Sequence, residues 1–212
     1  MKIKFCGIKR HEDIQYINKY KPDYAGFVFA GEKRRITPEK AAALAEGLAT
    51  GIKKVGVFVN DNPENIEYTV KLAGLGAVQL HGDEDEEYIV ELKKLLPDTE
   101  IWKAVRVRDS KNVVNALTLS ADMLLFDSFS SGEYGGTGKI ANIELIKSIK
   151  INRPFFIAGG IDSENIVYIV KELSPYGVDI SSGIETGGVK DESKIKSIMK
   201  TVNKINFERQ VI

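Results

Sequence analysis

The chain has 212 residues, of which 43% are hydrophobic and 28% are charged, a composition that is ordinary for a folded globular protein. Basic and acidic residues balance at 30 each, so we do not expect binding along the phosphate backbone of nucleic acid. The single cysteine excludes an internal disulfide framework and a cysteine-rich zinc site.

The beginning of the chain does not look like a secretory signal, because Lys4, Lys9 and Arg10 interrupt its apolar residues. No apolar run approaches the roughly 20 residues that span a bilayer. The chain has only two histidines, His11 and His81, which are few ligands for a histidine-based metal site. We therefore expect a cytoplasmic protein with no metal and with neither nucleic acid nor membrane as a partner.

Short β-rich runs alternate with amphipathic stretches along the whole chain, which predicts strands that pair in parallel with helices between them. No composition break interrupts this rhythm, so we expect a single domain over residues 1–212. Eight such units predict a (β/α)8 barrel, with a doubly wound open sheet as the alternative. The predicted strands are Lys2–Cys6, Tyr24–Phe29, Lys53–Val59, Ala77–Leu80, Glu100–Arg106, Met123–Phe126, Pro154–Ala158 and Gly177–Ile180.

Several helix starts carry capping signals. Thr37-Pro38 and Asn62-Pro63 each place a capping side chain before a proline at the first helical position. Asp83 followed by Glu86 predicts a capping box at the start of the helix after the fourth strand.

Polar and reactive residues follow the predicted strands, at the end of a parallel barrel where active sites lie. Cys6 ends the first strand, and Asp127 directly follows the sixth. Arg34 and Arg106 are possible partners for a carboxylate or phosphate, and Gln79 with His81 is expected to line the site. Exposed loops are polar in any case, so this set indicates a site without proving one.

Two glycine-bearing turns follow the seventh and eighth strands, at Gly159-Gly160 and Ser182-Gly183. Barrels frequently bind a phosphate there, where glycine lets the backbone approach the ligand. The plain alternative is that these glycines only make tight turns. The segment Gly135–Lys139 does not fit a nucleotide-binding P-loop, because Ile140 follows the lysine where serine or threonine is needed. We expect this segment to form a loop that closes over a ligand, with simple linker slack as the alternative.

Two residues are candidates for acid–base chemistry. Asp127 follows an apolar strand, and a carboxyl in such a partly dry position suits a general acid, although a capping or salt-bridged aspartate is the structural alternative. Cys6 has the same ambiguity, because a cysteine outside disulfides is most often a small core residue. Its strand-end position and the nearby Lys9 and Arg10 favour a thiolate that moves protons.

The motifs together resemble the phosphoribosylanthranilate isomerase family of tryptophan biosynthesis over almost the whole chain. The resemblance rests on the order of several motifs. They are Lys4–Ile8, Gly26–Phe29 with Lys33–Ile36, Val57–Asn60, Gln79–Glu84, Leu125–Ser128 with Gly135–Lys139, Ala158–Ile161 and Asp179–Glu185. The sequence departs from the family pattern at Glu32, where serine is usual, and at Phe5, which is often isoleucine.

The resemblance implies a (β/α)8 barrel that isomerises N-(5-phosphoribosyl)anthranilate, a small-molecule aminoaldose, to the aminoketose without a metal or organic cofactor. It implies Cys6 as general base, Asp127 as general acid and Arg34 as a contact to the substrate, in particular its carboxylate. The phosphate would lie at Gly159, Gly160, Ser182 and Gly183. We also assign Gln79, His81 and Asp179 to substrate binding.

Two other functions compete with this reading. One is another phosphosugar-binding barrel that works as an isomerase or synthase with different acid–base residues. The other is a barrel without catalysis that binds an anionic metabolite. The oligomeric state, monomer or homodimer, is left open.

Overall fold

A computed structural model describes residues 1–127 and 143–210 of the chain, with eight strands in a closed, all-parallel barrel in the order β1 to β8. This confirms the (β/α)8 prediction and excludes the open doubly wound sheet. The strands of the barrel are β1 (Lys2–Cys6), β2 (Tyr24–Val28), β3 (Lys53–Phe58), β4 (Ala77–Leu80), β5 (Glu100–Arg106), β6 (Met123–Asp127), β7 (Phe155–Ala158) and β8 (Gly177–Ile180).

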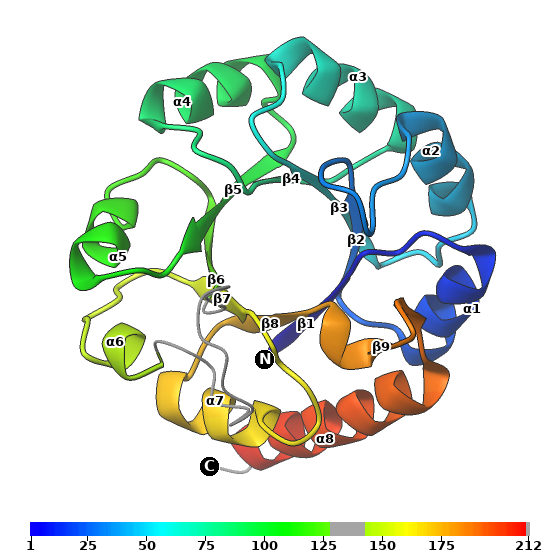
Figure 1. Ribbon diagram of the computed structural model, residues 1–212, viewed down its shortest axis with the longest axis vertical. Helices are drawn as coiled ribbons and strands as arrows, with labels where there is room; N and C mark the ends of the chain where they lie inside the picture. The colour runs from blue at the N-terminus through cyan, green and yellow to red at the C-terminus, as the bar shows by residue number, and fades with distance from the viewer. Residues whose placement is uncertain (128–142, 211–212) are drawn as a thin grey trace. The chain divides into compact units, whose positions relative to one another are not determined.

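Each strand is followed along the chain by a helix (Figure 1). After β8 a 3-10 turn, η1 (Ser182–Ile184), and a short hairpin of β9 (Glu185–Thr186) and β10 (Val189–Lys190) precede the last helix. The helices are α1 (His11–Tyr20), α2 (Pro38–Glu46), α3 (Pro63–Ala73), α4 (Glu86–Leu95), α5 (Ser110–Ala116), α6 (Ile143–Lys147), α7 (Ile166–Leu173) and α8 (Glu192–Gln210).

The helix caps largely follow the sequence signals. The Thr37 side chain accepts a hydrogen bond from the Lys40 amide at the start of α2, and Asn62 accepts one from Glu64 at the start of α3. The predicted capping box of Asp83 and Glu86 is wrong. Asp85 is the cap of α4 and accepts from the Tyr88 amide, because Asp83 takes part in the turn that precedes the helix.

The strands are buried on both faces, as a sheet covered by helices requires. On the inner face Tyr24 of β2 meets Trp102 of β5 edge to face, with ring centroids 5.0 Å apart. These strands are not neighbours in the sheet, so this contact fills the space that the strands enclose. On the outer face Phe29 stacks on Phe58 at 4.8 Å.

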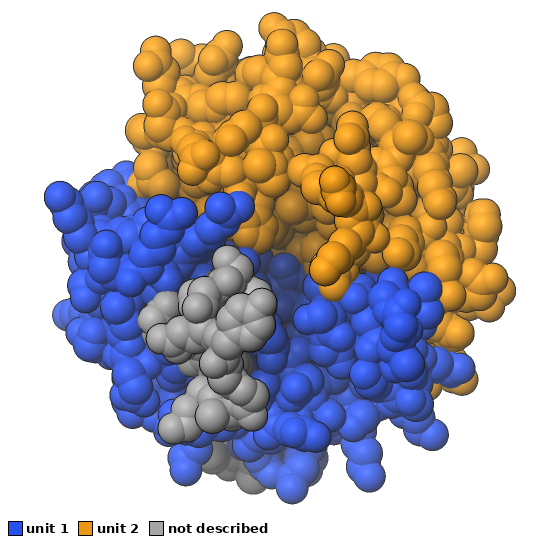
Figure 2. All heavy atoms as spheres, viewed as in Figure 1, with its two compact units in different colours: residues 1–3, 105–118, 124–212 blue, residues 4–104, 119–123 orange. Residues whose placement is uncertain are grey.

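The chain divides into two compact units, coloured separately in Figure 2. One unit comprises residues 4–104 and 119–123, and holds β2, β3, β4 and most of β1 and β5. The other comprises residues 1–3, 105–118 and 124–212, and holds β7, β8 and all of β6 except Met123. The predicted single domain over residues 1–212 stays a prediction. No helix in the described residues is long and apolar enough to cross a membrane.

Candidate active site

Cys6 is the last residue of β1 and is 7% exposed. Beyond it the chain turns at Gly7, whose φ of 84° lies in the region that glycine adopts readily. The Gly7 and Ile8 amides both donate to the Gly26 carbonyl, at 2.9 and 3.0 Å. The end of β1 is therefore fixed against β2, and the cysteine is held at the carboxyl end of its strand as predicted.

Arg34 lies directly over the turn that follows Cys6. A Cβ atom added at Gly7 would come within 2.5 Å of the Arg34 Cδ, so the arginine stem occupies the space that a side chain at position 7 would need. The loop that carries Arg34 is closed by a bridge between Val28 and Arg35 and by the Ile36 amide, which donates to Val28 at 2.9 Å. The fold thus brings Arg34 beside Cys6, as expected for two residues of one site.

A second cation, not considered in the sequence, lies close to the thiol. Lys4 is two residues before Cys6 on β1, so both side chains are on one face of the strand, and Lys4 is fully buried. A Cβ added at Gly26 on the neighbouring strand would be 2.9 Å from the Cys6 Sγ and 3.1 Å from the Lys4 Nζ. The signal that could have pointed to it is a lysine between the apolar residues Ile3 and Phe5 of the strand.

Gln79 and His81 lie together at the carboxyl end of β4. The Gln79 Nε2 is 3.2 Å from the His81 Nδ1, and the His81 amide donates to the Phe58 carbonyl at 2.8 Å. Gln79 is 1% exposed, and its Oε1 has no hydrogen-bond partner among the residues that the structure describes. A buried amide oxygen without a partner is costly, so this atom is suited to accept from a ligand.

A buried ion pair holds the loops around His81, and sequence reasoning gave it no role. The Lys103 Nζ is 2.6 Å from the Glu84 Oε2, with side-chain exposures of 8% and 2%. Lys103 also donates to the Gly82 carbonyl at 2.8 Å. Glu84 accepts from the Asn60 amide at 2.7 Å and from the Gly82 amide at 2.9 Å. One carboxylate therefore joins the loops after β3 and β4 to strand β5.

The predicted acid, Asp127, is the last residue of β6 and is half-buried. It pairs in register with Ala158 of β7, the residue before Gly159, and its carbonyl accepts from the Val107 amide at 3.0 Å. Asp127 and the first phosphate turn therefore belong to adjacent strand ends in one unit. The glycine-rich segment Gly135–Lys139, predicted to close over a ligand, lies outside the described residues.

The two predicted phosphate turns are in direct contact. A Cβ added at Gly183 would collide with the Ile161 carbonyl oxygen, so only glycine lets η1 pack against the turn after β7. Gly159 and Gly160 have φ values of 96° and 65°. Gly160, Ser182 and Gly183 line a common hollow of about 340 Å³, whose other walls are Asp162, Ser163, Glu164 and Lys194.

The hairpin after η1 is hydrogen-bonded to the second predicted phosphate turn. The Lys190 Nζ donates to the Ser181 carbonyl at 3.1 Å and to the Glu185 Oε1 at 2.8 Å, and both side chains are buried. At the start of α8, hydrogen bonds from the Ser193 and Thr186 side chains lower the pKa of Asp191 to about 2. This carboxylate stays charged and holds the hairpin to the helix.

The predicted site residues fall into two groups, one in each compact unit. Cys6, Arg34, Gln79 and His81 belong to the unit with β1 to β5, and Asp127, Gly159, Gly160, Asp179, Ser182 and Gly183 belong to the other. Asp179 is a buried residue of β8. Within the described ranges, no cluster of three or more histidine, cysteine, aspartate or glutamate side chains is arranged to hold a metal ion.

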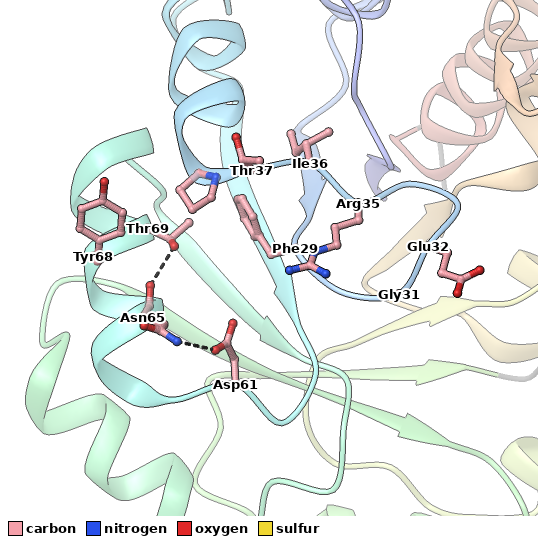
Figure 3. Close-up of a pocket in the computed structure, with 11 residues that line it drawn as sticks. Phe29, Gly31, Glu32, Arg35, Ile36, Thr37, Asp61, Asn65, Tyr68 and Thr69 are labelled. Atoms are coloured by element: carbon pink, nitrogen blue, oxygen red, sulfur yellow. Dashed lines mark hydrogen bonds between the residues drawn. The ribbon is translucent and has the colours of Figure 1, made fainter.

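A larger hollow of about 680 Å³ lies beside the loop that carries Arg34, but none of the predicted site residues lines it. Figure 3 shows its wall, where Asn65 is hydrogen-bonded to Asp61 and to Thr69. Glu32, Arg35 and Asp61 also line this hollow.

Fold and site together define a parallel (β/α)8-barrel protein whose reactive and glycine-bearing positions lie at the carboxyl ends of the strands, the arrangement of barrel enzymes. A sequence model described as N-(5'phosphoribosyl)anthranilate (PRA) isomerase matches residues 3–201. The chain belongs to this family.

Individual relatives agree with the match. The N-(5'-phosphoribosyl)anthranilate isomerase of Endomicrobium trichonymphae is 48% identical over 204 residues, 96% of this chain and 99% of that protein. The crystal structure of phosphoribosyl anthranilate isomerase from Thermotoga maritima superposes with a TM-score of 0.84 at 32% identity, over 96% of this chain and 99% of that one.

A second solved isomerase of this name is in complex with reduced 1-(o-carboxyphenylamino)-1-deoxyribulose 5-phosphate. It is similar with a TM-score of 0.77 at 32% identity, over 94% of this chain and 97% of that one. The family and fold predicted from the motifs are thereby confirmed, and with them the enzyme class, an aldose–ketose isomerase.

Proposed function

We propose that this chain isomerises N-(5'-phosphoribosyl)anthranilate in tryptophan biosynthesis, with Cys6 as general base and Asp127 as general acid. The activity follows from the family, and the roles of the individual residues are the proposal. The observation that supports them is the close approach of the Arg34 side chain to Gly7, the residue that follows the only cysteine of the chain.

The reaction begins at the sugar ring in this proposal. Asp127, as the general acid, donates a proton to the ring oxygen, the bond from that oxygen to C1 breaks, and the nitrogen lone pair forms a cationic imine. The positive charge makes the proton on C2 acidic. The Cys6 thiolate removes that proton, the C–H electron pair forms a C1–C2 double bond, and the imine electrons return to nitrogen, which gives an enolamine. The enolamine becomes the ketone when C1 takes up a proton and the C2 hydroxyl loses one.

Recognition of the substrate uses its two anionic ends. Arg34 would pair with the anthranilate carboxylate, for which a guanidinium has two matching donors. The backbone amides around Gly159, Gly160, Ser182 and Gly183 would take the phosphate, and the shared hollow at these turns supports this assignment. The buried Gln79 Oε1, with His81 beside it, is a further acceptor for a sugar hydroxyl, and Asp179 is assigned to the same role.

The relative in complex with a reduced product analogue supports a small phosphorylated substrate for the family fold. A cytoplasmic location and a choice between monomer and homodimer stay predictions.

The test is an assay of substrate loss by fluorescence, with phosphoribosylanthranilate generated fresh in the cuvette. Wild type should consume it faster than spontaneous hydrolysis and form the aminoketose. Cys6→Ser and Asp127→Asn should each lower kcat by about 10²- to 10⁴-fold, the usual contribution of general acid–base groups. Near-normal turnover in either variant would refute the assigned role.

Asp98→Asn is the matched control, because Asp98 is an exposed aspartate in the turn before β5, outside the strand ends that carry the site. Its kcat should equal that of wild type. Circular dichroism of all three variants separates loss of a catalytic group from loss of the fold.

A further inference from the structure

The Lys4 Nζ and the Cys6 Sγ lie within about 6 Å of one another in a single unit of the fold. Both atoms of interest, Nζ and Sγ, lie about equally near the position of an absent Cβ at Gly26, at 3.1 and 2.9 Å. Lys4 is 0% exposed and Cys6 is 7% exposed, so little water separates or screens them.

Glycine at position 26 is what makes this arrangement possible. Gly26 faces Cys6 in the register between β1 and β2, and its missing side chain leaves room for both neighbouring side chains on that face. Any larger residue would have to displace the lysine end or the sulfur. Gly26 is therefore explained by the pair, since its own backbone is that of an ordinary strand.

A buried ammonium next to a thiol favours the thiolate, because opposite charges attract strongly where the dielectric constant is low. Arg34 acts in the same direction from the loop over Gly7. On β2 the titratable residue of this face is Tyr24, which pairs in register with Lys4. Strand β8, next to β1 in the barrel order, carries one ionisable residue, Asp179.

We propose that Lys4 is a positioning residue whose charge keeps Cys6 as a thiolate, ready to remove the substrate proton. The inference rests on the proposed role of Cys6 and deepens it. A thiol at its ordinary titration point, near 8.5, would be mostly protonated at neutral pH and would be a poor base. Lys4 supplies the opposite charge without touching the substrate itself.

The chain has a single cysteine, so one carbon signal reports on Cys6 alone. Protein labelled with ¹³C at the cysteine Cβ is titrated by NMR from pH 5 to pH 10. In wild type we expect the midpoint to fall at least about one unit below the ordinary 8.5. In Lys4→Met the titration midpoint of Cys6 should rise by about one unit or more, which lowers the thiolate fraction about tenfold at a pH below both midpoints. The acid limb of the plot of kcat against pH should shift to higher pH by the same amount.

Two further variants make the result specific. Lys4→Arg keeps the charge and should hold the midpoint near that of wild type. Lys53→Met is the control for losing a strand lysine, because Lys53 is on β3, is 39% exposed and pairs with Glu100. It should leave the midpoint unchanged.

An unmoved midpoint in a folded Lys4→Met variant would overturn the inference. If that variant does not fold, wild type alone decides, since a midpoint at or above about 8.5 also overturns it. The titration measures the ionisation of the Cys6 thiol in the enzyme without substrate, so it does not depend on catalytic activity. If the proposed function is wrong, isomerase activity will be absent while the titration midpoint of Cys6 still shifts on substitution of Lys4. If this inference is wrong, the enzyme will be active and the midpoint of Cys6 will not shift.

Discussion

At the scale of single residues, the site depends on the space left by the missing side chains of two glycines. Gly7 allows the Arg34 stem to cross the chain directly after Cys6, and Gly26 allows Lys4 and Cys6 to share one face of β1. In both places the missing Cβ lets a cation approach the thiol. Gly7 and Gly26 therefore determine which charged side chains can lie near the Cys6 sulfur.

Gly7→Ala should separate the effect of Arg34 from simple backbone strain. The new methyl group would lie 2.5 Å from the Arg34 Cδ and would also sit at a φ of 84°. We expect a loss of stability of about 1–2 kcal/mol from the left-handed backbone, together with a clear rise in KM as the arginine moves. Thermal unfolding and steady-state kinetics measure the two effects.

Gly51→Ala is the matched control for that variant. Gly51 has a φ of 94°, and nothing lies within 4 Å of its added Cβ. It should lose a similar amount of stability with an unchanged KM. An equal KM in both variants would mean that Arg34 does not bind substrate from this position.

At the scale of elements, the loops of the site are held by buried charges. The Lys103–Glu84 pair joins the loops after β3 and β4 to β5, and the Lys190–Glu185 pair braces the hairpin behind the second phosphate turn. Each lysine also donates to a backbone carbonyl, so its charge has hydrogen-bond partners as well as a counter-ion. Such pairs define where a loop lies more than they stabilise the whole fold.

Removing one partner of the first pair should be far worse than removing both. Lys103→Met leaves the Glu84 carboxylate buried without its counter-ion, and we expect a loss of about 3–5 kcal/mol in the free energy of unfolding. The double variant Lys103→Met with Glu84→Gln should recover part of it. Urea denaturation of the single and double variants measures the coupling.

Lys71→Met provides the comparison with an ordinary surface pair. Lys71 pairs with Glu67 one turn away on α3 and is 69% exposed. Its loss should cost about 0.5 kcal/mol or less. A similar cost for Lys103→Met would show that the buried pair contributes nothing beyond a surface contact.

At the scale of the whole molecule, the two compact units do not follow the chain in simple order. The unit boundary falls within β1, within β5 and within β6, so each of these strands contributes residues to both units. A strand shared in this way is not a linker between domains. The single domain over residues 1–212 stays a prediction.

A single domain should unfold in one step. We expect one calorimetric transition, with the calorimetric enthalpy equal to the van't Hoff enthalpy. Fluorescence of Trp102, the only tryptophan and a residue of β5, should report the same midpoint as far-ultraviolet circular dichroism. Two transitions, or midpoints that disagree, would count against one cooperative domain.

The sequence by itself determined the local elements and the identity of the family. Short apolar runs placed the strands to within a residue or two, because burial on both faces leaves a continuous apolar stretch. Thr37 and Asn62 located helix starts because capping acts within one turn. The same local reasoning failed at Asp83, since its carboxylate accepts a hydrogen bond from Asn60 in the loop after β3 and Asp85 caps the helix instead.

Only the tertiary structure decided which distant residues meet. The approach of Lys4 and Cys6 across Gly26, the position of Arg34 over Gly7 and the packing of Gly183 on Ile161 all join segments that are separate in sequence. The physical reason is that strand register and loop closure set these contacts, and neither is written in any local pattern. The sequence thus identified Cys6 and its motif, and the fold determined which charged side chains lie near it.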